Sequence, residues 1–583
     1  MKKNREWLPD FGRLKKNSKN SSLDFKSIRL AVLGDSSTQL LVQAMKGYGF
    51  EYSINYQIFE ADYNQIDRMV FDPGSELYAF KPDFVLVLRS SEKLLKDFYH
   101  RDIHQKESFA ESQVQYMDSL FQNISTRLSC KVIMNTFIET DDAVFGNYAT
   151  KTKASFVYQV KNLNIRLMDY CREKKSVFLL DIASLSVNKG YANVFDPKMY
   201  INGALVFNLD FIPYLVKNVH DIIQAINGSF HKCVILDLDN TTWGGIIGDD
   251  GIEGIQIGDL GIGKAFTNLQ LWIRELKKRG IIVAVCSKNT EEIAKEPFQK
   301  HSDMVLRLDD IAVFVANWEN KVDNIRYIQN VLNIGFDSMV FLDDNPFERA
   351  MVKQAIPELT VPALPEDPSD YLVYLRDLNL FETASFTEED EIRTKQYQEE
   401  AKRSILQKSF ANEEAFLKSL EMRSEVKCFD KFTIPRIAQL SQRSNQFNLR
   451  TMRYTEEEVS ALSRANDYFT FSFDLKDVYG DYGLVAYVVL KKTENETLFI
   501  ENWVMSCRVL KRGMEIFTLN NIIQLAEKIG CTKIAGEYIP TKKNSIVKDH
   551  YINLGFSPVS DYVWELHLPV ANINRTTFIQ KEK

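Results

Sequence analysis

Carboxylates follow two apolar runs in this sequence, at the positions where the runs end. Asp237 and Asp239 close "CVILDLD" (233–239), and Asp343 and Asp344 close "SMVFLDD" (338–344). Residues two apart on a strand share one side of it, so two unpaired carboxylates there would repel each other and cost stability. A hard divalent cation removes that cost, and Mg²⁺ suits one or two carboxylates combined with phosphate oxygens. The first pair therefore predicts an Mg²⁺ site.

Two more polar residues stand at comparable positions. Ser287 closes "IIVAVCS" (281–287), and Lys321 opens a predicted helix in "NWENKVDNI" (317–325). Taken alone, D-x-D-x-T is also typical of a strand-end turn with a helix cap, and a lone Ser or Lys is more often a capping or solvated residue. Together, in order and each behind an apolar run, they predict a phosphate site. There the cation and Lys321 neutralise phosphoryl charge, Ser287 donates a hydrogen bond and one aspartate attacks.

These residues need a parallel sheet to bring them to one edge. Apolar runs at 233–239, 281–287, 304–308 and 338–344 alternate with helical patterns at 264–279, 290–298 and 322–333, which predicts such a sheet. An earlier alternation predicts strands at 28–35, 83–88, 130–137 and 176–181, with helices at 38–49, 113–128 and 157–174. A third block, with antiparallel-looking runs and a helix predicted over 513–529, follows the charged segment 387–404.

The predicted fold class is α/β in three domains. The first is a doubly wound sheet, the second a Rossmann-like domain that carries the aspartates, and the third an α+β domain. We expect an N-terminal extension over 1–27, domains over 28–228, 229–385 and 411–575, and a helical linker over 386–410.

Composition narrows the classes of function. The 583 residues carry a net charge of −7, so there is no polycationic signal for nucleic acid. No apolar run reaches the length of a membrane span, and the first residues lack the apolar core of a signal peptide, so no membrane partner is expected. Seven scattered cysteines without a C-x-x-C motif favour reduced thiols and a cytoplasmic location.

The central constellation resembles that of the haloacid dehalogenase (HAD) superfamily. The resemblance implies that Asp237 is a nucleophile that forms an aspartyl-phosphate, and that Asp239 is the general acid and then the base. Thr241, Ser287 and Lys321 would bind the phosphoryl group, and Asp343 and Asp344 would complete the Mg²⁺ site of Asp237 and Asp239. Only 45 residues separate Thr241 from Ser287, and 33 separate Ser287 from Lys321. Neither gap can hold a large cap domain, so the site is expected to be open to a large partner.

A closer resemblance is to the FkbH-like family, HAD subclass IIIC. It rests on "DLDNTTWGGIIGDDGIEGIQIG", "RGIIVAVCSKN", "ANWENKVDNI" and "NIGFDSMVFLDDNPFERAMV", and on "IAQLSQRSNQFNLRTMRYTEEEV" and "MSCRVLKRGMEIFTLNNIIQLA" further on. The family implies a glyceryl unit taken from 1,3-bisphosphoglycerate, dephosphorylated and passed as a thioester to an acyl carrier protein. Thioester chemistry needs a thiol, and Cys286 precedes Ser287. Core packing on a buried strand is an equally good interpretation of Cys286, and Cys507 is the next candidate.

The flanking blocks resemble two other folds. "LGDSST" places Ser36 after a strand, as in SGNH hydrolases, and Asn135 could supply an oxyanion donor. The usual Asp-x-x-His is missing, which favours a degenerate docking or substrate-binding domain. The third block resembles the GNAT acyltransferase fold, in which a Gly-rich loop binds pyrophosphate at a helix N-terminus. Lys511 stands at the first glycine of that loop, so the loop fits a carrier-bound pantetheine better than coenzyme A. A scaffold that uses these residues for core and surface is an equally good interpretation. The residues of this possible acyl site are Arg508, Arg512, Gly513, Asn544 and Tyr551.

The polar run 439–450, "QLSQRSNQFNLR", is interpreted as a domain junction or a wall of the acyl site. The predicted function is an Mg²⁺-dependent phosphatase and acyltransferase that uses a phosphorylated three-carbon donor. Two alternatives stay open: a phosphatase of a sugar or nucleotide-sugar intermediate in surface polysaccharide biosynthesis, and a non-catalytic assembly module.

Overall fold

The computed structural model describes residues 8–387, 390, 394–399, 412–493, 496–541, 543–570 and 576–582. Most of the predicted linker 386–410 therefore lies outside the described residues. The chain forms two compact units, Met1–Gln224 and Ala225–Lys583. In the described residues no helix is both long and apolar enough to cross a membrane.

The first unit is built on a parallel sheet of order β2-β1-β3-β4-β5. Its strands are β1 (Lys26–Gly34), β2 (Ile54–Glu60), β3 (Phe84–Leu88), β4 (Lys131–Asn135) and β5 (Val177–Leu180). The central strand β3, "FVLVL", is buried throughout, as expected of a parallel strand covered on both faces. The doubly wound sheet predicted for this block is confirmed. The missed strand is β2, "INYQIFE", an edge strand whose polar residues interrupt its apolar pattern.

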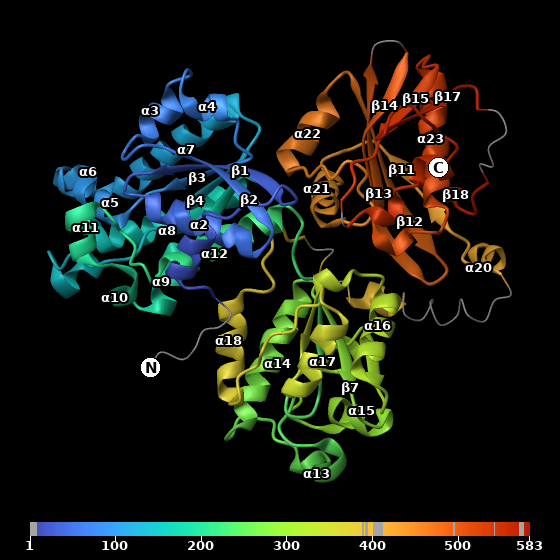
Figure 1. The fold of residues 1–583 in the computed structure, drawn as a ribbon, viewed down its shortest axis with the longest axis horizontal. Helices are drawn as coiled ribbons and strands as arrows, with labels where there is room; N and C mark the ends of the chain where they lie inside the picture. The colour runs from blue at the N-terminus through green and yellow to red at the C-terminus, as the bar shows by residue number, and fades with distance from the viewer. Residues whose placement is uncertain are drawn as a thin grey trace. The chain divides into compact units, whose positions relative to one another are not determined.

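Helices lie on either side of this sheet in Figure 1. The three predicted helices are present as α2 (Gln39–Glu51), α7 (Phe109–Arg127) and α8 (Phe156–Glu173), and Ser155 caps α8 by accepting a hydrogen bond from Tyr158 N. The others are α1 (Phe11–Asn17), α3 (Ile66–Phe71), α4 (Glu76–Phe80), α5 (Ser91–Tyr99), α6 (Ile103–Glu107), α9 (Ile182–Lys189), α10 (Tyr191–Val194), α11 (Pro197–Gly203) and α12 (Ile212–Ile226).

The second unit begins with a four-stranded parallel sheet of order β8-β7-β6-β9. Its strands are β6 (Cys233–Leu236), β7 (Ile282–Ser287), β8 (Val313–Ala316) and β9 (Met339–Leu342). The connecting and flanking helices are α13 (Ile247–Gly254), α14 (Gly263–Lys278), α15 (Glu291–Lys300), α16 (Lys321–Leu332), α17 (Pro346–Ala355) and α18 (Tyr371–Leu378). Residues 242–320 form these elements and their loops, so no inserted domain lies between Thr241 and Lys321.

One predicted strand is wrong: residues 304–308 are not a strand, and β8 lies five residues further along the chain. Met304 and Leu306 are buried, which produced the strand-like apolar alternation. Their backbone does not pair with the sheet. Instead the side-chain oxygen of Gln270 accepts hydrogen bonds from Val305 N and Leu306 N, both at 3.0 Å. A buried glutamine on α14 thus satisfies amides that a neighbouring strand would otherwise bind.

The same unit contains a larger mixed sheet of order β16-β17-β15-β14-β13-β12-β10-β18, with β11 paired to β12. Its long strands are β12 (Tyr468–Asp477), β13 (Gly480–Thr493), β14 (Thr497–Met505), β15 (Lys533–Glu537) and β17 (Val563–His567). The short ones are β10 (Arg423–Ser424), β11 (Val426–Lys427), β16 (Ser557–Pro558) and β18 (Gln580–Lys581). Helices α20 (Glu413–Ser419), α21 (Ile434–Arg443), α22 (Glu456–Arg464), α23 (Met514–Lys528) and α24 (His550–Asn553) accompany it, which confirms a multi-domain α/β architecture.

Strands β14 and β15 run parallel but pair only as far as Ile500 and Gly536. Beyond that point β14 pairs with residues 447–449 instead: Met505 N donates to Phe447 O at 3.1 Å, and Leu449 N donates to Trp503 O at 3.3 Å. On its other side Leu449 O accepts from Ile539 N at 2.8 Å. The chain itself therefore fills the gap between the two strands.

The run 439–450, predicted as a domain junction or a wall of the acyl site, contacts the segment before β6 and also lines a cavity, so both interpretations stay predictions. Asn445 Nδ2 donates to Gly228 O at 2.7 Å, and Lys232 Nζ donates to Arg443 O at 2.6 Å. Arg443 also pairs with the buried Asp390. Of the amides in this run, Asn445 contacts the segment before β6, whereas Gln442 and Asn448 donate to Tyr454 O and Met452 O.

Candidate active site

Three strand ends and one helix start bring polar side chains to the carboxyl edge of the four-stranded sheet. Asp237 follows β6, Ser287 ends β7, and Asp343 follows β9. Asn320 caps α16 by accepting from Asp323 N at 2.9 Å, which places Lys321 in the first turn. The predicted convergence of these residues is what the parallel sheet produces.

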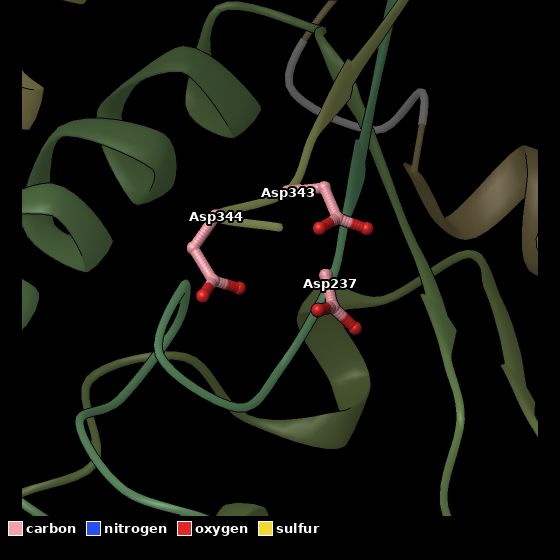
Figure 2. Close-up of side chains that lie close together, drawn as sticks. All are labelled: Asp237, Asp343 and Asp344. Carbon is pink, nitrogen blue, oxygen red and sulfur yellow. The ribbon is translucent and has the colours of Figure 1, made fainter. Parts of the chain in front are cut away.

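The carboxylates of Asp237, Asp343 and Asp344 face a common space, as Figure 2 shows. One oxygen of each lies within 4.8 Å of the others, and Asp237 and Asp343 are buried. Burial raises the pKa of Asp237 above its ordinary value, with Lys321 opposing the shift and Asp343 adding to it. Burial and the charge of Asp343 also raise the pKa of Asp344. Without a cation, three crowded carboxylates are an unfavourable arrangement.

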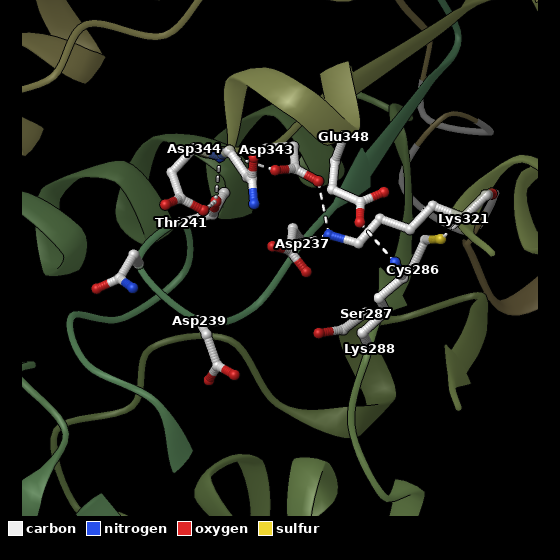
Figure 3. Close-up of polar contacts among 12 residues, drawn as sticks. Asp237, Asp239, Thr241, Cys286, Ser287, Lys288, Lys321, Asp343, Asp344 and Glu348 are labelled. Atoms are coloured by element: carbon white, nitrogen blue, oxygen red, sulfur yellow. Dashed lines mark hydrogen bonds and ion pairs between the residues drawn. The ribbon is translucent and has the colours of Figure 1, made fainter. Parts of the chain in front are cut away.

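Lys321 is the cation of this group (Figure 3). Its Nζ lies 2.6 Å from Asp343 Oδ2 and 3.0 Å from Asp237 Oδ2, and only 3% of the residue is exposed. Burial lowers the pKa of Lys321, but the charges of Asp237 and Asp343 outweigh this and keep it above its ordinary value. One ammonium against three carboxylates leaves a net negative charge in a buried place.

This donor set fits a magnesium ion. Carboxylate oxygens are the ligands that Mg²⁺ prefers, and the set leaves room for the phosphate and water oxygens that complete its coordination. Among the described residues, Asp237, Asp343 and Asp344 form the one group of three possible ligands close enough to share an ion. Asp343 and Asp344, between which the sequence left the choice open, both lie in this group, and their role as ligands stays a prediction.

The side chain of Asp239 does not join this group, which corrects its prediction as a carboxylate ligand. Strand β6 ends at Leu236, so the period-two alternation that paired Asp239 with Asp237 no longer holds. Asp239 instead accepts hydrogen bonds from Trp243 Nε1, Ile247 N and Asn289 Nδ2 at 2.9–3.0 Å. These three donors fix the position of its carboxylate.

The two predicted phosphate-binding hydroxyls differ in their surroundings. Ser287 Oγ lies at the end of β7, and its one described partner is Asn289 Nδ2 at 3.4 Å. Thr241 Oγ1 is buried and committed to Asp344: it accepts from Asp344 N at 2.9 Å and contacts Asp344 Oδ1 at 3.2 Å. The hydroxyl of Ser287 therefore keeps capacity for a further hydrogen bond, whereas that of Thr241 orients an aspartate.

Two groups near the site were missed by sequence reasoning. Arg349 on α17 donates to Asp343 O at 2.7 Å and to Asp344 O at 2.6 Å, which fixes the backbone of the acidic pair. Lys288 Nζ pairs with Glu348 Oε1 at 2.6 Å. The run "DDNPFER" could have indicated them. In it the cap residue Asn345 and Pro346 predict a helix start, and the first turns of that helix place Glu348 and Arg349 near the end of β9.

Cys286 lies on the opposite face of β7 from Ser287. It is fully buried among Cys233, Ile235 and Ala284, and its Sγ is 3.8 Å from Lys321 O. Burial raises the pKa of this thiol well above its ordinary value, so it stays protonated. Of the two interpretations left open, core packing is the one that this position favours.

Comparison with known proteins agrees with this geometry. The FkbH N-terminal domain model matches residues 29–224. A solved structure, the N-terminal part of a Bacteroides fragilis protein that contains a phosphatase domain and is complexed with Mg, is 49% identical. It aligns with a TM-score of 0.63 over 65% of this chain and 100% of that one. This chain belongs to the FkbH-like family.

Two acetyltransferases of known structure align with the chain at low TM-scores. A ribosomal-protein-alanine N-acetyltransferase from Escherichia coli is 16% identical, with a TM-score of 0.20, over 26% of the FkbH-like chain and 97% of its own. A spermidine/spermine N-acetyltransferase from Vibrio cholerae is 12% identical, with a TM-score of 0.21, over 25% and 94%. No curated protein matches the chain.

The polar residues of the first unit of this FkbH-like chain serve its loops. Asn135 accepts from Arg89 N at 2.8 Å and donates to Arg89 O and Thr136 O at 3.0 and 2.8 Å. Asp35 accepts from Ser90 N. Ser36 is buried, and no described hydrogen bond joins its hydroxyl to a histidine or to Asn135. The structure thus gives Ser36 no general base among the described residues.

The residues predicted for an acyl site in the third block of the FkbH-like chain do not converge on one space. Asn544 is buried and binds Thr541 N, Ile539 O and Asn448 O. Tyr551 packs against Gly536, and Arg512 pairs with Asp477 and Tyr482. Gly513 begins α23 with a φ of +81°, and Thr577 Oγ1 donates to its carbonyl. Arg508 lines a cavity of the second unit that the other four residues do not line.

Proposed function

We propose that this FkbH-like chain is an Mg²⁺-dependent phosphatase whose chemistry takes place at Asp237. The observation that carries the proposal is the buried group of Asp237, Asp343 and Asp344 against the single ammonium of Lys321. Such a group suits the charge of a phosphoryl substrate only when a metal ion is added. The relative crystallised with Mg, at 49% identity, supports magnesium as that ion.

The residues divide the reaction as follows. A carboxylate oxygen of Asp237 attacks phosphorus, the bond from phosphorus to the leaving oxygen breaks, and Asp239 gives that oxygen a proton. Water then attacks the aspartyl-phosphate, Asp239 takes its proton, and the bond between Asp237 and phosphorus breaks to release phosphate. Lys321 and Ser287 stabilise the phosphoryl oxygens throughout. Bound Mg²⁺, held by Asp237, Asp343 and Asp344, supplies the neutralising charge.

The test is phosphate release from phosphomonoesters by the full chain in Mg²⁺. Asp237→Asn removes the nucleophile and is expected to lower the rate by at least about 10³-fold. Asp249→Asn is the matched control, because Asp249 is exposed on α13 and should leave the rate unchanged. Full phosphate release by Asp237→Asn would falsify the assignment of Asp237.

A second candidate function is acyl transfer, which membership of the family favours. The thiol of an acyl carrier protein would attack the acyl carbon of a donor such as 1,3-bisphosphoglycerate. The bond from that carbon to the phosphate oxygen breaks, phosphate leaves and the thiol proton passes to solvent. The ester phosphate at the other end is removed at Asp237. The absence of any inserted domain between Thr241 and Lys321 supports this proposal, because an open site admits a protein-bound substrate.

Intact-mass measurement separates acyl transfer from its rivals. The full chain is incubated with 1,3-bisphosphoglycerate and a carrier protein, and a glyceryl adduct on the carrier is the expected result. Phosphate release without an adduct supports a phosphatase of sugar or nucleotide-sugar intermediates. If no substrate gives phosphate release or an adduct, the result supports a non-catalytic assembly module.

A further inference from the structure

A cavity of about 590 Å³ lies in the second unit, where residues of the four-stranded sheet meet residues after β14. This volume is within the range of small-molecule sites in proteins. The cavity is reached by Lys232 before β6 and by Ser338 before β9, at the amino ends of those strands. Asp237 and Asp343 stand at the carboxyl ends of the same strands, so the cavity is separate from the candidate active site.

The charged residues that line the cavity are mainly cationic. Five basic residues line it against two acidic ones: Lys232, Arg436, Arg443, Arg508 and Lys543 against Asp337 and Glu358. Asp337 is already paired with Lys543 at 2.6 Å, and Glu358 is exposed. Asp390, which lies outside the lining, pairs with Arg443, and the five basic residues still outnumber these three acidic ones.

Arg508 is a buried cation of this lining whose described partners are neutral. It is only 8% exposed, and its described partners are neutral: its Nε donates to Ser506 Oγ at 3.2 Å, and its NH1 donates to Gln396 Oε1. No carboxylate among the described residues forms an ion pair with it. A buried guanidinium without a counter-charge is costly, and its planar donor array suits a phosphate group. Gly513, where α23 begins, does not line the cavity, so the site is not a helix N-terminus.

A second group in the cavity needs a partner of the opposite kind. The side-chain oxygen of Gln446 is buried and has no hydrogen-bond partner among the described residues. Such an acceptor is satisfied by an N–H or O–H donor. Phe447, Met505 and Ile546 provide apolar lining between the polar groups.

We propose that this cavity binds an organic phosphate that also carries an amide N–H or a hydroxyl. The phosphate lies on Arg508, and the donor lies on Gln446. The site is distinct from the aspartate centre and does not depend on its activity. Cys507, which follows β14 and lines the same cavity, lies beside the bound molecule.

Titration calorimetry on the full chain tests the proposal, with EDTA present so that no phosphate ester is hydrolysed. The probes are 4′-phosphopantetheine, which has amide donors, glucose 6-phosphate, which has hydroxyl donors, inorganic phosphate and pantetheine. One of the two organic phosphates is expected to bind more tightly than inorganic phosphate and than pantetheine, and which one binds identifies the donor. No binding of either organic phosphate overturns the proposal.

Two variants locate the binding. Arg508→Gln is expected to weaken binding of the organic phosphate at least about tenfold, because the charge-assisted contact is lost. Lys511→Gln removes a nearby charge that is exposed and outside the cavity, and should bind as the unaltered chain does. Equal affinity of Arg508→Gln and Lys511→Gln overturns the proposal, because the ligand then lies elsewhere.

A measurement on the unaltered chain guards against misfolding of the variant. Iodoacetamide labelling of each cysteine is followed by peptide mass spectrometry with and without 4′-phosphopantetheine or glucose 6-phosphate. The ligand that binds is expected to slow labelling of Cys507 at least about fivefold, in proportion to its occupancy of the site. Cys428, which is exposed and outside the cavity, is the control and should react at one rate throughout. Equal labelling of Cys507 with and without a saturating ligand overturns the proposal.

Discussion

The two parallel sheets of this chain both have polar residues at the ends of buried strands, but the surroundings of those residues differ. In each, a buried strand ends in polar residues: "LGDSS" after β1 in the first unit, and "ILDLD" after β6 in the second. In the first unit Asp35 accepts from the backbone N of Ser90, and Asn135 at the end of β4 binds backbone groups of Arg89 and Thr136. In the second, Asp237, Asp343 and Asp344 crowd around one lysine.

The difference shows which property of a strand end indicates chemistry. Polar residues at the carboxyl edge are common to both sheets, so their presence alone does not separate a site from a loop anchor. Charge that the protein's own groups do not balance does separate them, because such charge costs stability and persists where a ligand balances it. Four substitutions test this contrast.

Lys321→Met should have the largest effect. It leaves Asp237 and Asp343 buried without their ammonium, and breaking a buried pair in this way costs about 3–5 kcal/mol of stability. Phosphate release should fall by at least about 10²-fold, because phosphoryl charge loses its partner. Urea unfolding without Mg²⁺ and initial rates with Mg²⁺ measure the two effects.

Lys353→Met is the control for that substitution, because Lys353 is exposed on α17 and should change stability by no more than about 0.5 kcal/mol. If Lys321→Met unfolds at the same urea concentration as the control, Lys321 does not stabilise the buried carboxylates. The proposed contrast in unbalanced charge between the two sheets is then wrong.

Glu92 is an exception among the polar residues of the first unit, because its buried carboxylate is not fully hydrogen-bonded. Its Oε2 is buried without a hydrogen-bond partner, and burial raises the pKa of Glu92 from 4.5 to about 7. Between these values the folded state binds more protons than the unfolded state, so the stability contributed at this position falls as pH rises from 4.5 to 7. Glu92→Gln should therefore stabilise the chain by about 2–3 kcal/mol at pH 8 and by nothing at pH 4.

Thermal or urea unfolding at the two pH values measures this difference. Glu111→Gln, on the exposed face of α7, is the control and should show no pH-dependent gain. Equal effects of the Glu92 substitution at pH 4 and pH 8 would mean that the charge of the Glu92 carboxylate is already balanced. Glu92 would then not be an exception in the first unit.

Much of the fold and of the central site could be predicted from the sequence. Apolar runs of four to six residues give β6, β7 and β9, and the residues that follow them are the ones that converge. The failures have physical causes. The run 304–308 is apolar because Met304 and Leu306 face the core, yet a glutamine distant in sequence binds its amides, and no local pattern carries that information.

The prediction that the side chain of Asp239 is a metal ligand lost its support for a related reason. Alternation predicts the direction of a side chain only while the strand continues, and β6 ends before Asp239. Trp243 and Asn289, which hold its carboxylate, are four and fifty residues away. In the third block, residues 447–449 occupy the gap between β14 and β15, and this pairing of distant segments was equally invisible. Domain boundaries stay predictions.

Asn135→Ala should affect stability without affecting chemistry. The substitution removes three hydrogen bonds in a buried place and should lower the free energy of unfolding by about 2–3 kcal/mol. Phosphate release by the folded protein should stay within twofold of the unaltered rate. Asn147→Ala, at an exposed position, is the matched control and should be neutral. A loss of activity greater than the loss of folded protein would make Asn135 a functional residue.

Ser36→Ala should have the smallest effect, and it is the sharpest test of the first sheet. The hydroxyl is buried, and no described hydrogen bond joins it to a base, so its removal should change stability by no more than about 0.5 kcal/mol. Without a base to take its proton, a serine is a weak nucleophile, and a fluorophosphonate probe should leave it unlabelled. Labelling at Ser36 that Ser36→Ala abolishes would show that a satisfied strand end can still do chemistry, and unbalanced charge would then no longer distinguish the two sheets.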